Sequence, residues 1–355
     1  MPRRAVAAVV HVVHEYFIWA IVLSYLVAAL APQLGLWVRQ ADLGALVGAG
    51  DIHIALPPLL LGVLLFNAGL GVPLQDLAAF GKTPQKGLLL LGGLLGNIAV
   101  PLAMIVVVAA TMRLWHNPDE AQQILVGLAL VAAMPIAGAS TAWAQNANGS
   151  LVVSLGLVLL TTLLSPLTTP LVLHAVGFLT TGDYSEDLHE LASGEATAFL
   201  GAWVIVPSLL GLTIRSAVGS ERFETAKPYV KLGNFIVLLT LNYSNAALVL
   251  PKVLELPDAD LLAAIGLVVS ALCVAGFGGG LALSRLLGVS RSETASLTFA
   301  LGMNNNGAGL VLASIALADH PQVMLPIIFY NLVQHLFASL VDWRLVQRES
   351  AYAGD

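Results

Sequence analysis

Charged residues are scarce in this chain of 355 residues: they make up 10% of it, against about 25% in soluble domains. Hydrophobic residues account for 58%, and the mean hydropathy is +0.87. This composition excludes an ordinary soluble domain and predicts an integral membrane protein. The formal net charge of −6 is not accompanied by a basic patch, so we expect no nucleic-acid partner.

Several kinds of chemistry are also missing. The single cysteine, Cys273, lies in an apolar run and has no second cysteine for an internal disulfide. The sequence contains no nucleotide-binding loop, no H-E-x-x-H metal motif and no recognisable set of nucleophile and base. We therefore expect neither an enzyme nor an organic cofactor, and coupling to an ion gradient is favoured over coupling to ATP.

The apolar residues gather in ten windows, each of about the 20 residues that a helix needs to cross a bilayer. Ten spans place both termini on one side of the membrane. Arg39, Arg113 and Lys252 then fall on the other side, whereas the remaining lysines and arginines, out of fifteen, lie with the termini. Because positive charge is retained in the cytoplasm, this asymmetry predicts a multi-pass inner-membrane protein with both termini cytoplasmic. The windows are 14–34, 52–72, 87–110, 122–144, 150–177, 196–217, 232–250, 260–284, 294–317 and 322–343.

An acidic segment at 179–195, expected outside the membrane, separates the first five spans from the last five. The halves 1–178 and 196–355 would then have opposite orientations, as in transporters built from inverted repeats. The fourth span of the chain contains Pro135, which removes a backbone donor, and Gly138, which weakens a helix. The ninth contains three consecutive asparagines, at 304–306, flanked by glycines. The predicted fold class is an all-α polytopic membrane protein of two inverted five-helix repeats, with spans 4 and 9 broken.

A helix that breaks at membrane depth exposes backbone N–H and C=O groups that hydrocarbon cannot pair. The break at 304–306 must therefore line a polar cavity, and we interpret it as part of a binding site. Other polar residues lie at depth, among them Asn97, Ser154, Asn242, Asn245 and His335. No aspartate or glutamate lies near the centre of any predicted span. That absence weakens a proton-antiport mechanism and requires a cation site to use neutral oxygens.

The order and spacing of several motifs resemble those of the bile acid:sodium symporter family. The motifs are residues 16–19 and 31–32 in the first span, 64–70 and 74–77 in and after the second, 135–141 in the fourth, 163–167 in the fifth, 302–307 in the ninth, and Gln334-His335 in the tenth. The resemblance implies a panel of spans 1, 2, 6 and 7 and a core of spans 3, 4, 5, 8, 9 and 10. It also implies that spans 4 and 9 cross, and that the substrate binds between panel and core.

The resemblance assigns the family's sodium ligands to particular positions of this chain, and only some of the residues at those positions are polar. Ala300 stands where the family usually has a glutamate, Val158 where it has a threonine, and Gly96, beside Asn97, where it has a glutamine. One alternative is that Asn97 and the asparagines 304–306 re-form a neutral site. The other is that the protein works without sodium, as a uniporter or with a different ion. The implied set is Ser140, Thr141, Ser154, Val158, Ala300, Leu301, Met303, Asn304 and about Gly96.

These observations predict a secondary transporter that moves a small organic anion by alternating access. An uncoupled carrier and a membrane receptor or sensor of the same fold are the alternatives. The expected partners are the organic anion and membrane lipid, with sodium as the possible ion. The candidate substrate-binding residues are Asn305, Asn306, Asn242, Asn245 and His335, and the candidate ion-binding residues are Ser140, Thr141, Ser154, Asn304, Met303 and Asn97.

Overall fold

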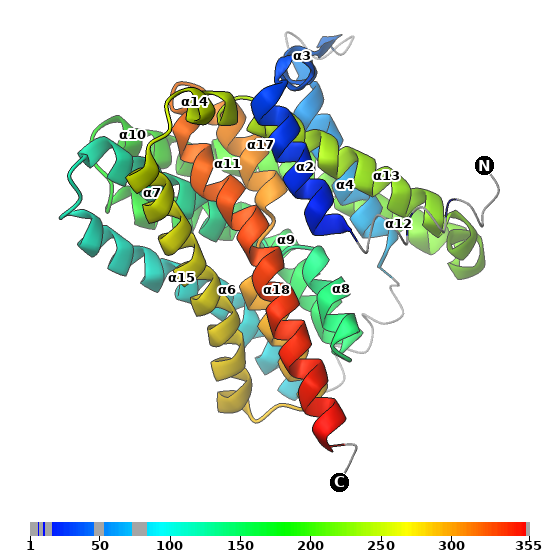
Figure 1. The fold of residues 1–355 in the computed structure, drawn as a ribbon. Coiled ribbons are helices and arrows are strands. Elements are labelled where there is room, and N and C mark those ends of the chain that lie inside the picture. The colour runs from blue at the N-terminus through cyan, green and yellow to red at the C-terminus, as the bar shows by residue number, and fades with distance from the viewer. Residues whose placement is uncertain (1–5, 7–9, 11–15, 46–52, 73–83, 353–355) are drawn as a thin grey trace. The chain divides into compact units, whose positions relative to one another are not determined.

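The computed structural model describes residues 16–45, 53–72 and 84–352, together with Val6 and Val10, and these residues are mainly helical (Figure 1). Among the described residues, five helical stretches are long and apolar enough to cross a membrane, or six if a bent pair is one span. A polytopic helical membrane protein is therefore confirmed, whereas the count of ten spans and the inverted repeat stay predictions. The five are Gln85–Met112, Leu151–Gly177, Asp183–Val218, Ala259–Leu287 and Pro321–Leu345, and the bent pair is Phe17–Leu30 with Gln33–Gln40.

One short element departs from the all-α prediction. Strand β1 (Asp42–Ala45), in the connection after the first predicted span, pairs antiparallel with β2 (His53–Ala55), at the start of the predicted window 52–72. Asp and Gly in β1 are weak helix formers. The pair ends the helical part of that connection and leads directly into α4 (Leu56–Leu70).

The chain forms two compact units, each assembled from segments far apart in the sequence. The first unit comprises Met1–Leu74, Phe199–Asp258 and Leu310–Pro321, and the second comprises Gln75–Ala198, Ala259–Gly309 and Gln322–Asp355. The first unit thus contains the segments of predicted spans 1, 2, 6 and 7 and the end of the ninth.

Small residues bring helices close together in the first unit. Gly69 in α4 and Gly211 in α12 leave no room for a Cβ, because the backbone of the other helix fills that space. Such contacts stabilise helix pairs where lipid supplies no hydrophobic driving force. Helices α2 and α3 are bent by 92° at Ala31 and Pro32. The described helices of this unit are α2 (Phe17–Leu30), α3 (Gln33–Gln40), α4, η3 (Gly201–Ile205), α12 (Val206–Val218), α13 (Ser220–Ala246), α14 (Leu250–Glu255) and most of α17 (Asn306–Ala316).

In the second unit, α15 packs on three other helices, α16, α6 and α18. A Cβ at Gly276 or Gly280 of α15 would lie 2.6 Å from a carbonyl oxygen of α16, so the two helices touch backbone to backbone. The acidic segment is helical and forms α10. The helices are α6 (Pro84–Met112), α7 (Pro118–Ala133), α8 (Ala139–Asn146), α9 (Leu151–Gly177), α10 (Asp183–Glu190), η2 (Leu191–Glu195), α15 (Ala259–Leu287), α16 (Arg291–Gly302), η4 (Pro321–Val323) and α18 (Met324–Tyr352), with α11 (Ala196–Leu200) at the boundary.

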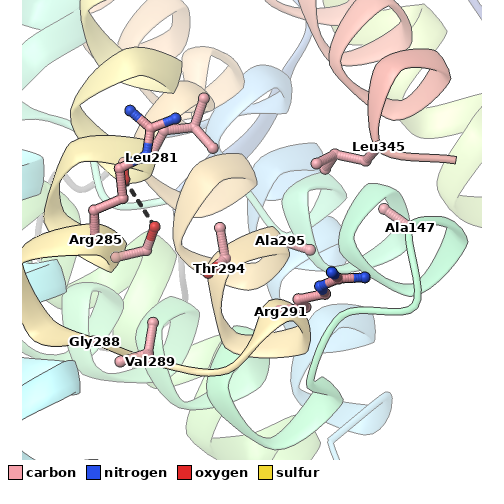
Figure 2. Close-up of a pocket in the computed structure, with 10 residues that line it drawn as sticks. Ala147, Leu281, Arg285, Gly288, Val289, Arg291, Thr294, Ala295 and Leu345 are labelled. Atoms are coloured by element: carbon pink, nitrogen blue, oxygen red, sulfur yellow. Dashed lines mark hydrogen bonds between the residues drawn. The ribbon is translucent and has the colours of Figure 1, made fainter. Parts of the chain in front are cut away.

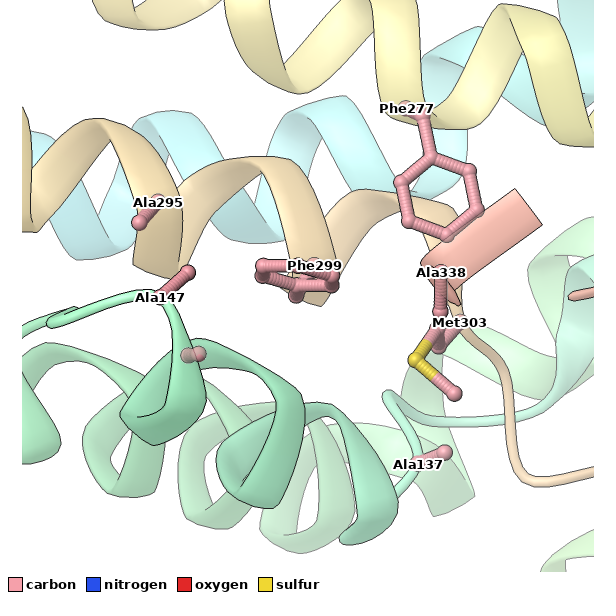
Figure 3. Packing of buried hydrophobic residues seen from close by; sticks show 8 residues of the cluster. Ala137, Ala147, Phe277, Ala295, Phe299, Met303 and Ala338 are labelled. Carbon is pink, nitrogen blue, oxygen red and sulfur yellow. The ribbon is translucent and has the colours of Figure 1, made fainter. Parts of the chain in front are cut away.

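Aromatic side chains fill the space beside α16 in the second unit. The ring of Phe299 lies edge to face with Phe277, at 6.1 Å between centroids, and stacks with Trp143 at 6.3 Å. Figure 3 shows Met303 at the end of this cluster, next to Ala137 and Ala338. The cluster joins α8, α15, α16 and α18, and it therefore holds the end of α16 in place.

Candidate functional site

Both predicted helix breaks are present. Helix α7 ends at Ala133 and α8 begins at Ala139, whereas α16 ends at Gly302 and α17 begins at Asn306. Met134 and Met303 have extended backbone conformations at the two ends. Proline in one break and consecutive asparagines in the other disfavour a continuous helix.

The two breaks pair with each other inside the second unit. Ile136 and Asn304 form an antiparallel β-bridge. The N–H of Ala137 donates to the carbonyl of Met303 at 2.9 Å, and the N–H of Asn305 donates to the carbonyl of Pro135 at 2.9 Å. Each broken helix thus supplies the hydrogen-bond partners that the other has lost, which water-free surroundings require.

The two paired breaks, residues 134–138 and 303–305, are called the crossing. Side chains from neighbouring helices form hydrogen bonds with further backbone groups in and beside it. The N–H of Asn304 donates to Oε1 of Gln334 at 3.1 Å, and the N–H of Ile136 donates to Oγ1 of Thr161 at 3.2 Å. Tyr330 OH donates to the carbonyl of Gly302 at 3.3 Å. The sequence identified Gln334 only as part of a family motif, and it did not indicate this role for Gln334 or Thr161. The crossing is thereby anchored to α9 and α18.

Several buried polar side-chain atoms near these breaks have no hydrogen-bond partner among the described residues. An unpaired buried polar group costs about 1–3 kcal/mol, so buried polar atoms ordinarily have a partner. Hard cations prefer oxygen ligands, which hydroxyl and amide groups can supply. The atoms are Asn97 Oδ1, Ser140 Oγ, Thr141 Oγ1, Ser154 Oγ, Asn304 Oδ1, and Oδ1 and Nδ2 of Asn306.

Apart from the two atoms of Asn306, which is a substrate-binding candidate, these atoms belong to the polar ion-binding candidates. Ser140 and Thr141 open α8, Ser154 lies in the first turn of α9, and Asn97 lies on α6. Helices α6, α8 and α9 each pack on α16, which ends at the crossing. The remaining candidate, Met303, contributes its carbonyl to the bridge with Ala137. The candidate side chains are hydroxyls, amides and one thioether, so this set carries no formal charge. The described residues contain no cluster of three or more His, Cys, Asp or Glu side chains that could hold a metal ion.

Apolar side chains of the protein pack around the positions where the family resemblance implies further ligands. Ala300 is 1% exposed and belongs to an apolar cluster that Val158 also contacts. A Cβ at Gly96 would lie 2.7 Å from Cδ2 of Leu301, a member of the same cluster. The glutamate, threonine and glutamine expected from the resemblance are thus replaced by residues packed among apolar groups.

The substrate-binding candidates fall in both units. In the second unit, Oδ1 of Asn305 accepts from the N–H of Ala308 at 3.3 Å and so caps the start of α17, and Asn306 is 1% exposed. The indole N–H of Trp143 donates to Nδ1 of His335 at 3.4 Å. Asn242 and Asn245 lie on α13 of the first unit. Their roles in substrate binding stay predictions.

A separate cavity of about 590 Å³ lies in the second unit (Figure 2). Arg285 and Arg291 flank it, and Ser284 Oγ donates to the carbonyl of Leu281 at 2.8 Å. Its described lining includes none of the predicted site residues, so it is distinct from the crossing. The lining residues are Ala147, Leu281, Ser284, Arg285, Gly288, Val289, Arg291, Thr294, Ala295 and Leu345.

Crossed broken helices in a polytopic helical protein are typical of secondary transporters. Residues 58–255, more than half of the chain, match the model of the Sodium Bile acid symporter family. The chain belongs to this family, as the motifs predicted, and the family consists of transporters rather than enzymes. The chain is also similar to a protein of Bacillus subtilis (strain 168) named "Uncharacterized protein YbaS". The two are 26% identical over 222 residues, which cover 62% of this chain and 68% of that protein.

Proposed function

We propose that this protein is a secondary transporter that moves a small organic anion across the inner membrane by alternating access. The observation that carries the proposal is the antiparallel bridge between Ile136 and Asn304, where two broken helices meet. The inverted repeats, 1–178 and 196–355, and the division into panel and core belong to the same proposal.

Helix ends at the crossing supply the chemistry for anion binding. Helices α8 and α17 begin there, and a helix N-terminus carries partial positive charge and unpaired N–H groups. The buried amide of Asn306 has a free donor among the described residues. In this proposal the amides of Asn305 and Asn306 orient the anion. His335 on α18, and Asn242 and Asn245 on α13, stay candidate substrate contacts from the sequence alone.

Sodium is the proposed coupling ion, held by neutral oxygens of Ser140, Thr141, Ser154, Asn97 and Asn304. Support comes from the absence of hydrogen-bond partners for these oxygens among the described residues. Because no carboxylate offsets the dehydration of the ion, we expect binding in the millimolar range or weaker.

An uncoupled carrier is the second candidate, and the apolar surroundings of Ala300 and Val158 favour it. The two candidates differ in one property: a symporter accumulates its anion against a gradient when sodium is supplied, whereas a carrier only equilibrates it.

The test is uptake into proteoliposomes that contain the full chain. Currents on a solid-supported membrane are recorded for organic acids from formate to taurocholate, in sodium, potassium and choline buffers. We expect at least one acid to be transported, with an enhancement specific to sodium. Transport that is equal in the three buffers would select the uncoupled carrier. Binding of an acid without any transport would overturn the proposal in favour of a receptor.

A further inference from the structure

A hydrogen bond from α13 stabilises the bend between α2 and α3 in the first unit. The chain turns by 92° at Ala31 and Pro32, and the hydroxyl of Tyr243 on α13 donates to the carbonyl of Ala31 at 2.5 Å. This bond pairs a carbonyl that the bend has freed from the helix. Helix α3 is thereby tied to α13 at its first turn.

A glycine then lets α3 lie directly on α13. A Cβ at Gly35 would lie 2.7 Å from Cβ of Ala247 and 3.3 Å from Cα of Ser244. Arg39 follows Gly35 by four residues, so it lies on the same face of α3. The close approach at Gly35 therefore brings the Arg39 side chain onto the end of α13.

Arg39 is partly buried and meets two neutral acceptors there. Its Nη1 donates to Oδ1 of Asn245 at 3.0 Å, and its Nη2 donates to the carbonyl of Ser314 at 2.8 Å. No carboxylate among the described residues forms an ion pair with Arg39. A guanidinium has five N–H groups, and a desolvated cation without a counter-charge is unfavourable. The site therefore has spare donors and an uncompensated positive charge.

Asn245 adds a second donor at the same place. Its side chain is fully buried, at 0% exposure, and its oxygen is already used by Arg39. The Nδ2 of the same amide has no acceptor among the described residues. The unpartnered amide donor of Asn245 thus lies beside a guanidinium that has neutral acceptors but no counter-charge among the described residues, and a bound oxyanion would supply both the acceptor and the charge.

We propose that Arg39 and Asn245 form a carboxylate-binding subsite for the transported anion. This inference rests on the proposed function and adds the class of substrate, an organic acid, and one recognition residue, Arg39. The planar guanidinium matches a carboxylate in geometry as well as in charge. By the distribution of lysine and arginine, Arg39 lies near the outer face, where an anion would arrive.

Thermal unfolding of the purified full chain tests the subsite, with potassium benzoate and its uncharged analogue benzamide as probes at equal concentration. Benzoate should raise the Tm of the wild type by several degrees at tens of millimolar, and benzamide should not. Potassium chloride at the same ionic strength is the salt control. In Arg39→Gln the benzoate-specific rise should disappear. A rise that is the same in Arg39→Gln and in the wild type, or no rise in the wild type, would overturn the proposal.

A second variant guards against misfolding of Arg39→Gln. Asn245→Asp is nearly isosteric and places a carboxylate beside the guanidinium, so we expect it to fold and to exclude benzoate. Persistent benzoate stabilisation in this variant, or an equal rise with potassium phosphate in the wild type, would contradict a subsite for organic carboxylates. If Arg39→Gln transports an organic acid as well as the wild type does, the subsite proposal is contradicted but the proposed transport function is not.

Discussion

The backbone of Ile136, between α7 and α8, forms an antiparallel bridge with the backbone of Asn304, between α16 and α17. Two helix breaks that would each be unfavourable alone become compatible with burial, because they satisfy each other's hydrogen bonds. The stability of the crossing therefore depends on a few side chains that complete this pairing.

Gln334→Leu should destabilise the protein. The mutation removes the acceptor of the Asn304 N–H, which lies where water cannot replace it. We expect a loss of about 1–3 kcal/mol in the free energy of unfolding, measured by denaturation of the purified protein in detergent. Gln145→Leu, on the exposed side of α8, is the matched control and should change stability by less than about 0.5 kcal/mol. Equal effects of the two mutations would mean that the bond to Asn304 contributes nothing.

Thr161→Val tests the other side-chain acceptor at the crossing. Valine keeps the shape of threonine but leaves the N–H of Ile136 without its acceptor. A loss of about 1–3 kcal/mol is expected. In Thr168→Val, the hydroxyl that is lost bonds only to a carbonyl one turn back in α9, so this control should unfold close to wild type. If both valine variants unfold alike, Thr161 does not support the break.

Packing of α15 on α16 predicts a contrast between two glycines on one helix. A Cβ at Gly276 would lie 2.6 Å from the carbonyl oxygen of Leu301, whereas a Cβ at Gly278 meets no described atom within 4 Å. Gly276→Ala should lower the Tm, because the helices must separate. Gly278→Ala should raise it slightly, since alanine is favoured over glycine in a helix by about 0.5–1 kcal/mol. A Tm for Gly276→Ala at or above wild type would contradict this packing.

The sequence predicted the breaks because their causes are local. Pro135, Gly138 and the asparagines 304–306 disfavour a helix wherever they stand. It could not predict that Ile136 pairs with Asn304, nor that Gln334 accepts from Asn304, because partners are chosen by tertiary packing. The β1–β2 pair was missed because a hydropathy window registers apolar content and not backbone conformation, so residues 53–55 were assigned to the second span.

Arg39 shows the same limit in the first unit. The distribution of positive charge predicts that Arg39 lies on the outer side, but its contact with Asn245 depends on the bend at Pro32 and the close approach at Gly35. Neither the contact of Arg39 with Asn245 nor the approach of Gly35 to α13 can be recognised from the residues around it in the sequence. Among the ion-site candidates, the resemblance identified the residue types, and the structure added which oxygens lack partners.

Sodium should stabilise the wild-type protein selectively. A ligand that binds only the folded state adds RT ln(1 + [L]/Kd), or about 0.4 kcal/mol when its concentration equals Kd. We expect the Tm to rise with sodium up to high millimolar concentrations, but not with potassium or choline. Ser154→Ala should abolish the rise, because it removes an unpartnered oxygen. Ser165→Ala is the control, since its hydroxyl is already bonded to the carbonyl of Thr162. A sodium response that survives in Ser154→Ala would exclude this serine as a ligand.

Ala300→Glu should make the protein depend on sodium. Ala300 is 1% exposed within an apolar cluster, so an ionised glutamate there would be strongly unfavourable without a cation beside it. We expect the variant to be less stable than wild type in potassium and to recover most of that loss in sodium, with a sodium-specific increase in transport. Ala300→Gln adds the same volume without the charge and should show no such recovery. If Ala300→Glu folds normally and responds to sodium no more than the glutamine variant, position 300 does not face the ion site. The assignment of the family's ligands to α16 would then be wrong, and the neutral oxygens around Ser140 would have to be explained by packing alone.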